Sequence, residues 1–245
     1  MNRDKKICIT IDQDWCHDQL LNYGLELFSR FQIPVTVFVT DFSKKWYQSD
    51  FIEIGAHVNF EKNSTQGNSI DEIILNANES IENCRSFRSH SLLTSTRILD
   101  KVSELTNWDI ESNVYLRDFV ESKITQFPGK RSINRMIINF EDDIDMRIDR
   151  WPHKILDECQ DLDRFLLTFD FHPIHIFLNS QNMKMYEFVK SLGLVGGDVK
   201  ELLKFQNDQS IQGTYYHLLE FLTQCKSRTD IYFEKCSDVV DGVVN

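Results

Sequence analysis

The chain has 245 residues, and its 38 acidic residues outnumber its 27 basic residues, which gives a formal net charge of −11. This balance argues against nucleic acid or an anionic membrane surface as a partner, because both bind to basic patches. The length permits one large α/β domain or two small ones, and the lack of a linker rich in Pro, Ser or Gly favours a single domain over residues 1–245.

The first residues include basic side chains but no long apolar stretch, and no apolar run reaches the ~18 residues that a membrane-spanning helix needs. We therefore expect neither a signal peptide nor membrane insertion. The six cysteines are scattered and form no Cys-x-x-Cys pair. This pattern favours reduced thiols and a cytoplasmic location.

An apolar run near the N-terminus ends in two carboxylates. Residues 7–11 (ICITI) are typical of a strand buried on both faces, as in a parallel sheet, and Asp12 and Asp14 follow. Because side chains alternate along a strand, the two acids are expected to project to the same side. They could bind a metal or share acid–base chemistry, although either could simply cap the following helix.

Further along the chain, predicted strands alternate with predicted helices, which is typical of an α/β fold with mostly parallel strands. The predicted strands are residues 7–11, 35–40, 51–57, 84–88, 108–110, part of 131–140, and 165–171. The predicted helices are residues 20–31, 69–81, 94–105, about 180–192, and 213–226. Residues 205–245 are expected to form a C-terminal helical extension packed on the domain, with a peripheral acidic tail.

Reactive side chains follow most of the predicted strands. They are Asp12 and Asp14, His57, Arg88 and His90, the acids 141–143, and His172 with His175. Each has an ordinary structural explanation, but catalytic groups from several strand ends are typical of barrel enzymes. Asp with His suits a divalent metal such as zinc, which can lower the pKa of its bound water to about 7. The pattern therefore predicts metal-assisted hydrolysis of an acyl or phosphoryl compound.

Four segments occur in an order that resembles the polysaccharide deacetylases of the NodB-homology type, also called carbohydrate esterase family 4. They are TIDQD at 10–14, IGAHVNF at 54–60, FRSHSL at 87–92 and FHPIHIFLN at 171–179. The resemblance is strongest to the cytoplasmic branch that serves bacterial surface polysaccharides. It implies a distorted (β/α) barrel and a metal-dependent hydrolase. This enzyme would remove N-acetyl groups from an amino sugar or glycan in O-antigen or capsule biosynthesis.

The same resemblance implies roles for the matching residues. Asp12 corresponds to the general base, and Arg88 corresponds to the arginine that orients this base. His57 corresponds to the first histidine of the family's metal motif. The second acid of the family's first motif is a metal ligand, but Gln13 stands there, so Asp14 is the expected substitute.

The third metal ligand stays open, because Glu61 occupies the position of the family's second metal histidine. The candidates are His90, Asn59 and Glu61, of which we favour His90. The ion is expected to be divalent, with zinc preferred.

His172 corresponds to the acid that protonates the leaving amine, and either Asp142 or Asp143 would keep this histidine charged. His175 is an alternative acid. If residues 172–175 are extended, the two histidines face opposite sides, so only one can point into the site.

Two other functions stay open because of these departures from the family pattern. One is a degenerate relative that binds carbohydrate without catalysis, and the other is a different metal-dependent hydrolase on the same barrel. Sugar rings could stack on some of the four tryptophans, namely Trp15, Trp46, Trp108 and Trp151, although at least half of these are expected to serve only in packing.

Overall fold

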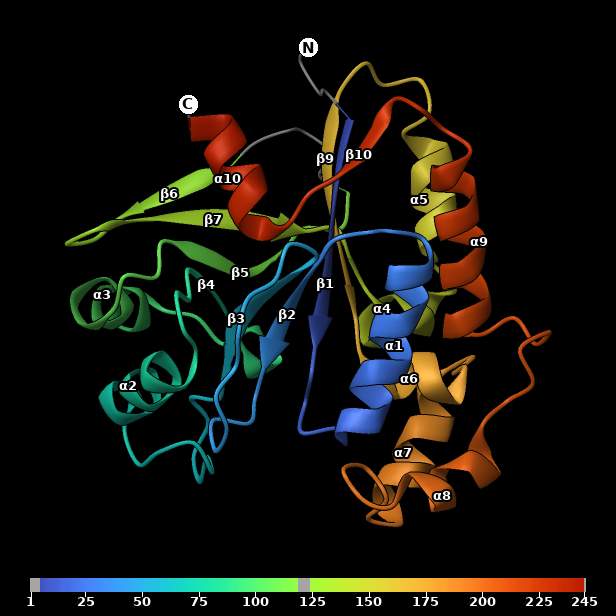
Figure 1. The fold of residues 1–245 in the computed structure, drawn as a ribbon, viewed down its shortest axis with the longest axis horizontal. Helices are drawn as coiled ribbons and strands as arrows, with labels where there is room; N and C mark the ends of the chain where they lie inside the picture. Colours follow the sequence, from blue (N-terminus) through green and yellow to red (C-terminus); the bar gives the residue numbers. More distant parts are fainter. Residues whose placement is uncertain (1–4, 119–123, 245) are drawn as a thin grey trace.

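The computed structural model describes residues 5–118 and 124–244, so the outermost ends of the predicted domain lie outside the described part. Strands and helices alternate along most of the chain (Figure 1). The strands are β1 (Lys5–Asp12), β2 (Val35–Val39), β3 (Ile52–Val58), β4 (Ser86–Ser89), β5 (Ile110–Tyr115), β6 (Thr125–Pro128), β7 (Ser132–Ile138), β8 (Phe140–Glu141), β9 (Phe165–Phe171) and β10 (Ile231–Phe233).

The longer helices lie on the outside of the strands, and shorter helical turns follow several strand ends (Figure 1). The helices are α1 (Asp18–Arg30), α2 (Ile70–Ser80), α3 (Thr96–Leu105), α4 (Asp142–Asp145), α5 (Pro152–Glu158), α6 (Pro173–Leu178), α7 (Met183–Ser191), α8 (Val199–Leu202), α9 (Thr214–Lys226) and α10 (Cys236–Val244). The 3₁₀ turns are η1 (His90–Leu92), η2 (Met146–Ile148) and η3 (Leu203–Phe205). No helix of the described residues is both long and apolar enough to cross a membrane.

One continuous segment closes the strands into a barrel. Parallel pairing runs in the order β5, β4, β3, β2, β1, β9 and β8, and β7 pairs in parallel with the other side of β5. β7 leads through Asn139 directly into β8, and the Asn139 amide donates to the Thr168 carbonyl on β9 at 2.9 Å. Residues 132–141 therefore connect β5 with β9, and the expected distorted barrel is confirmed. β6 is an antiparallel addition at the edge.

Alternate side chains of β1 face the outer core and the barrel interior. Ile7, Ile9 and Ile11 belong to the hydrophobic core that the surrounding helices share. Cys8 and Thr10 face the interior, where Cys8 packs in a second apolar cluster and Thr10 Oγ1 donates to the Asp170 carboxylate on β9. The interior is thus apolar where β1 begins and polar where it ends, as a site at the carboxyl ends of the strands requires.

The C-terminal residues close the apolar end of the barrel. β10 pairs in parallel with β1, and Cys236, Val239 and Val240 of α10 are buried in the cluster that contains Cys8. In Figure 1, α10 lies at the end of the barrel where β1 and β2 begin. The expectation of a peripheral acidic tail is therefore wrong. The predicted extension at 205–245 also contains a strand of the sheet, so it is not only helical, while the single domain stays a prediction.

Candidate active site

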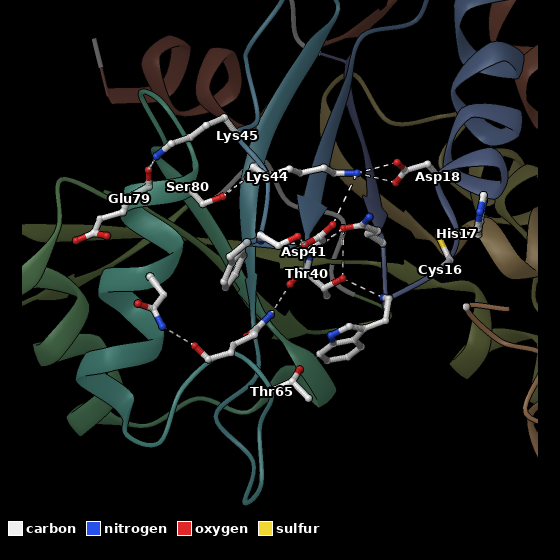
Figure 2. Close-up of a pocket in the computed structure, with 17 residues that line it drawn as sticks. Cys16, His17, Asp18, Thr40, Asp41, Lys44, Lys45, Thr65, Glu79 and Ser80 are labelled. Carbon is white, nitrogen blue, oxygen red and sulfur yellow. Dashed lines mark hydrogen bonds and ion pairs between the residues drawn. The ribbon is translucent and has the colours of Figure 1, made fainter.

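The site begins where β1 ends, at Asp12. The next residue, Gln13, is buried, and its side-chain Oε1 accepts hydrogen bonds from the backbone amides of Thr40 (2.8 Å) and Asp41 (3.3 Å). Thr40 and Asp41 follow β2 and are labelled in Figure 2. Gln13 therefore joins the carboxyl ends of two neighbouring strands.

Asp14 reaches the site from a strained turn. The strand alternation behind the expected same-side projection of Asp12 and Asp14 does not extend to Asp14, because Asp14 and Trp15 have φ of 46° and 54°, in the left-handed region. Ser91 and Leu92, which follow His90, also have positive φ of 57° and 52°. Each such residue costs of order 1–3 kcal/mol, and strain of this kind clusters at functional sites. Neither Asp12 nor Asp14 caps α1, whose N-cap is His17.

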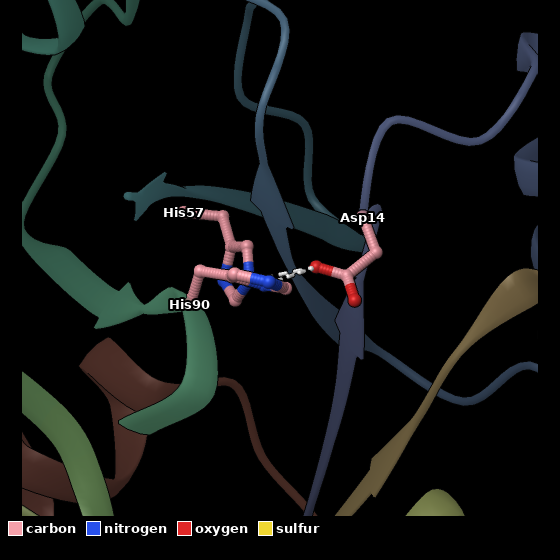
Figure 3. A group of neighbouring side chains, drawn as sticks. All are labelled: Asp14, His57 and His90. Atoms are coloured by element: carbon pink, nitrogen blue, oxygen red, sulfur yellow. Dashed lines mark hydrogen bonds and ion pairs between the residues drawn. The ribbon is translucent and has the colours of Figure 1, made fainter. Parts of the chain in front are cut away.

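Asp14, His57 and His90 form a compact cluster (Figure 3). His57 Nε2 lies 3.0 Å from Asp14 Oδ1, and His90 Nδ1 lies 3.1 Å from the same oxygen. Burial acts to raise the pKa of Asp14, but hydrogen bonds from the two histidines hold it well below its usual range. The cluster therefore presents an anionic oxygen and two imidazole nitrogens.

This donor set fits a divalent transition ion. One carboxylate and two imidazoles leave a coordination position for water, as in catalytic zinc sites. The three ligand atoms lie within 4.8 Å of one another. Of the three open candidates for the third ligand, the structure brings His90 into the cluster. Glu61 is exposed, and Asn59 Oδ1 accepts from the Glu61 amide at 2.9 Å.

Arg88 fixes Asp12 beside this cluster. Arg88 is fully buried in β4, and its Nη1 donates to Asp12 Oδ1 at 2.9 Å, while its Nε donates to the Ser112 carbonyl at 2.8 Å. The other carboxylate oxygen of Asp12 lies 3.6 Å from His57 Nδ1. Asp12 therefore sits between a fixed cation and the cluster, as the sequence predicts for a base that an arginine orients.

Asp170 is a member of this buried network that sequence reasoning missed. It lies in β9 and forms an ion pair with Arg88, and it accepts from Thr10 Oγ1 at 2.6 Å. Burial raises the pKa of Asp170 to about 8, with the charge of Asp12 adding to the effect and that of Arg88 opposing it. The available signal was a single acid in the apolar strand FLLTFDF, two residues before His172 and so on the same face.

His172 faces the cluster from the position directly after β9. Its Nδ1 lies 2.7 Å from Asp142 Oδ1, and its backbone amide donates to Asp142 Oδ2 at 3.0 Å. Its Nε2 lies 3.6 Å from Asp14 Oδ2. Burial acts to lower the pKa of His172, but the charge and hydrogen bond of Asp142 raise it well above the usual value. The imidazole is therefore held charged, with one nitrogen anchored and the other directed at the cluster.

The structure distinguishes Asp142 from Asp143. Asp142 is fully buried against His172, and burial raises its pKa to about 6 despite the opposing effect of the histidine. The Asp143 carboxylate makes no hydrogen bond to His172, although it lies near that ring together with Glu141. Asp142 is thus the acid that orients His172.

The expected extended segment after His172 is wrong. Pro173 starts the short helix α6, because proline suits the first turn of a helix, where its missing N–H is not needed. His175 is buried, with Nδ1 at 3.2 Å from Ser180 Oγ, and burial together with the charge of His172 lowers its pKa to about 3. Burial therefore favours the uncharged form of the His175 imidazole.

Of the four tryptophans, only Trp15 stands at the site with an exposed ring. Trp108 and Trp151 are buried in the core, as expected for tryptophans that serve only in packing. Trp46 is partly buried, and its Nε1 donates to the Asp41 carbonyl. Trp15 is 37% exposed, and its ring meets that of His90 edge-on with centroids 5.1 Å apart.

A family model described as "WbmS-like: Polysaccharide deacetylase" matches residues 9–190. This range includes every predicted site residue. No curated protein sequence matches the chain significantly.

Solved structures show the same fold. A protein described as a polysaccharide deacetylase involved in O-antigen biosynthesis (WbmS), from Bordetella bronchiseptica, matches with a TM-score of 0.73 and 22% identity over 91% of each chain. A polysaccharide deacetylase from Pseudomonas aeruginosa matches with a TM-score of 0.56 and 11% identity, over 98% of this chain and 91% of that one. A family 4 acetyl xylan esterase from Clostridium thermocellum, in complex with a cobalt ion, matches with a TM-score of 0.51 and 13% identity, over 97% and 91%.

Proposed function

The chain belongs to the WbmS-like family of polysaccharide deacetylases, and from that premise we propose that it removes N-acetyl groups from an amino sugar with the help of a divalent metal. Zinc is the preferred ion, because Asp14, His57 and His90 offer two nitrogens and one oxygen. We further propose that the sugar belongs to a bacterial surface polysaccharide such as O-antigen or capsule. The name of the Bordetella bronchiseptica protein supports this assignment.

The observation that supports the proposal most strongly is that a base and an acid both approach the Asp14–His57–His90 cluster. Asp12, which Arg88 holds, approaches from one side, and His172, which Asp142 holds, approaches from the other. A divalent ion at the cluster would polarise the acetyl carbonyl and acidify a water molecule. A relative that only binds carbohydrate would not require a base, an acid and metal ligands at the same place.

The residues of the chain then divide the proton transfers. Asp12 takes the proton of the attacking water, and Arg88 keeps its carboxylate in position. His172 gives the proton on Nε2 to the amide nitrogen as the C–N bond breaks, and His172 keeps its Nδ1 proton, which donates to the Asp142 carboxylate. The products are the free amine and acetic acid, which then ionises to acetate in solution, so the one proton taken by the base is balanced by the one given by the acid.

Acetate release from a panel of N-acetylated amino sugars tests this function. The wild type should release acetate, and Asp12→Asn should lower kcat by about 10²–10⁴-fold, as expected for loss of a general base. Asp142→Asn should also lower kcat strongly, whereas Asp143→Asn, its matched control, should have a smaller effect. A wild type that releases no acetate from any member, or an Asp12→Asn variant with full activity, would contradict the proposal.

A further inference from the structure

Two helices on the outside of the barrel bring two histidines and a glutamate together, outside the candidate active site. His153 lies in the first turn of α5, and His217 and Glu220 lie about one turn apart on α9. Figure 1 shows α5 and α9 side by side on the outside of the strands, and the two helices pack against each other. The deacetylation proposed above uses none of these three residues.

The His217 ring is held by two stacked neighbours. It lies nearly parallel to the ring of Trp151, with centroids 4.2 Å apart, and to the ring of His153, with centroids 5.1 Å apart. His217 is only 7% exposed, and its Nδ1 is buried without a hydrogen bond among the described residues. Buried polar atoms of this kind are rare in native proteins, and a bound ion is one of the partners that satisfy them.

The Glu220 carboxylate faces both histidines at distances that are too long for hydrogen bonds. Its Oε2 lies 3.7 Å from His153 Nε2 and 3.8 Å from His217 Nδ1. Two ligand atoms of one zinc ion each lie about 2.0–2.2 Å from it, so they can be up to about 4.3 Å apart. Both separations fall within this limit, and one ligand atom from each residue lies within 4.8 Å of the other two. A small rotation of the exposed Glu220 and the half-buried His153 therefore lets one ion contact all three residues.

The surroundings provide the space and the chemical form that a metal site needs. A cavity of about 440 Å³ opens beside the cluster, and His153 and Glu220 line it together with Asp157, Tyr216 and Thr223. This space can hold the water that completes the coordination of an ion with three protein ligands. Burial lowers the pKa of both imidazoles, which favours the uncharged form that binds metal.

We propose that His153, His217 and Glu220 form a second site for a divalent transition ion such as zinc. Ring stacking explains two parallel imidazoles, but it does not explain why a nitrogen of each faces the same carboxylate oxygen. Two imidazole nitrogens and one carboxylate oxygen are ligands that zinc prefers. The ion links α5 to α9, which packs on β9 with the centroids of Phe221 and Phe169 4.8 Å apart. The inference goes beyond the proposed function, because this ion fastens two helices and takes no part in catalysis.

The second site should fill only after the candidate active site. Glu220 is exposed, so its side chain loses conformational freedom when an ion fixes it. In the active-site cluster, Asp14 Oδ1 already lies 3.0 and 3.1 Å from the two histidines. We therefore expect the second ion when zinc is in molar excess over the chain.

Equilibrium dialysis against Zn²⁺ in molar excess tests the site by counting the bound ions per chain. Glu220→Ala removes the exposed ligand with little risk to folding, and His153→Gln removes a ligand from the other helix. Glu158→Ala is the matched control, because it removes an exposed carboxylate of α5 that does not line the cavity. We expect the wild type and Glu158→Ala to bind one ion that Glu220→Ala and His153→Gln bind at least about tenfold more weakly.

Thermal unfolding gives a second readout, because an ion that binds only the folded chain stabilises it. Added zinc should raise the unfolding midpoint of the wild type and of Glu158→Ala by more than that of Glu220→Ala. Equal zinc binding by the wild type and Glu220→Ala, or an equal loss in Glu158→Ala, would overturn the inference. The comparison is a difference between variants, so its outcome does not depend on the Asp14 cluster or on acetate release.

Discussion

Burial inside the barrel shifts the pKa of individual carboxyl groups, and Asp170 is the example. One cation, Arg88, lies between the carboxylates of Asp12 and Asp170 and cannot neutralise both. Burial raises the pKa of Asp170 to about 8, whereas an unfolded chain would have a value near 3.9. Near neutral pH burial therefore favours the protonated form of Asp170, whose contact with Arg88 is an ion pair only when the carboxyl group is ionised.

This protonation predicts how stability depends on pH. Between about pH 4 and pH 8 the folded state keeps the Asp170 proton that the unfolded state loses, so this residue's contribution to stability falls as pH rises. Asp170→Asn cannot titrate. The unfolding free energy of the wild type should therefore fall relative to that of Asp170→Asn between pH 5 and pH 8, as measured by denaturant titration. A difference that stays constant, or that grows in favour of the wild type, would mean that Asp170 is ionised throughout.

The sequence identifies which residue types surround the site, but not every contact. The positions of Asp12, His57, Arg88 and His172 follow from strand ends, because those ends meet at one edge of a parallel barrel. The conformation of Asp14 could not be predicted, since its left-handed φ depends on the contacts of a whole turn. The site residues' chemical roles stay proposals until they are tested.

At the scale of elements, long apolar strands are predictable and short pairings are not. β1 and β9 are strongly apolar runs, and both form where the sequence predicts them. β10 has only three residues, and it pairs with a strand more than 200 positions away in the sequence. Local periodicity carries no information about such a contact, so the sequence predicts only a helical extension over residues 205–245 and a peripheral acidic tail.

The closure of the barrel by α10 can be tested by substitution. Val239→Asp places a carboxylate in the apolar cluster that contains Cys8, Leu166 and Val240. We expect the free energy of unfolding to fall by more than about 2 kcal/mol, the cost of burying a polar group without a partner. Asp238→Ser on the exposed side of the same helix should change it by less than about 0.5 kcal/mol. Denaturant unfolding that does not distinguish the two variants would show that α10 does not seal the barrel.

At the scale of the whole molecule, the order of elements predicts an α/β fold, and the resemblance to the family predicts the barrel. The closing step depends on residues 132–141, which pair with β5 on one side and β9 on the other. The sequence pattern predicts that segment poorly, because its strands are short and interrupted at Asn139. The closed ring brings β1, β3, β4 and β9 to one edge, and so assembles the site from residues up to 160 positions apart, such as Asp12 and His172.

The metal content of the purified protein tests the central claim most directly. Wild type, His90→Ala and Glu61→Ala are each titrated with Zn²⁺ after chelation, and bound metal and acetate release are measured on the same samples. We expect the wild type and Glu61→Ala to bind about one ion per chain and to regain activity together. We expect His90→Ala to bind zinc at least about 10–100-fold more weakly and to stay inactive at the same zinc concentration. Full binding and activity in His90→Ala, or acetate release by the wild type that chelation does not affect, would contradict the metal centre proposed at Asp14, His57 and His90.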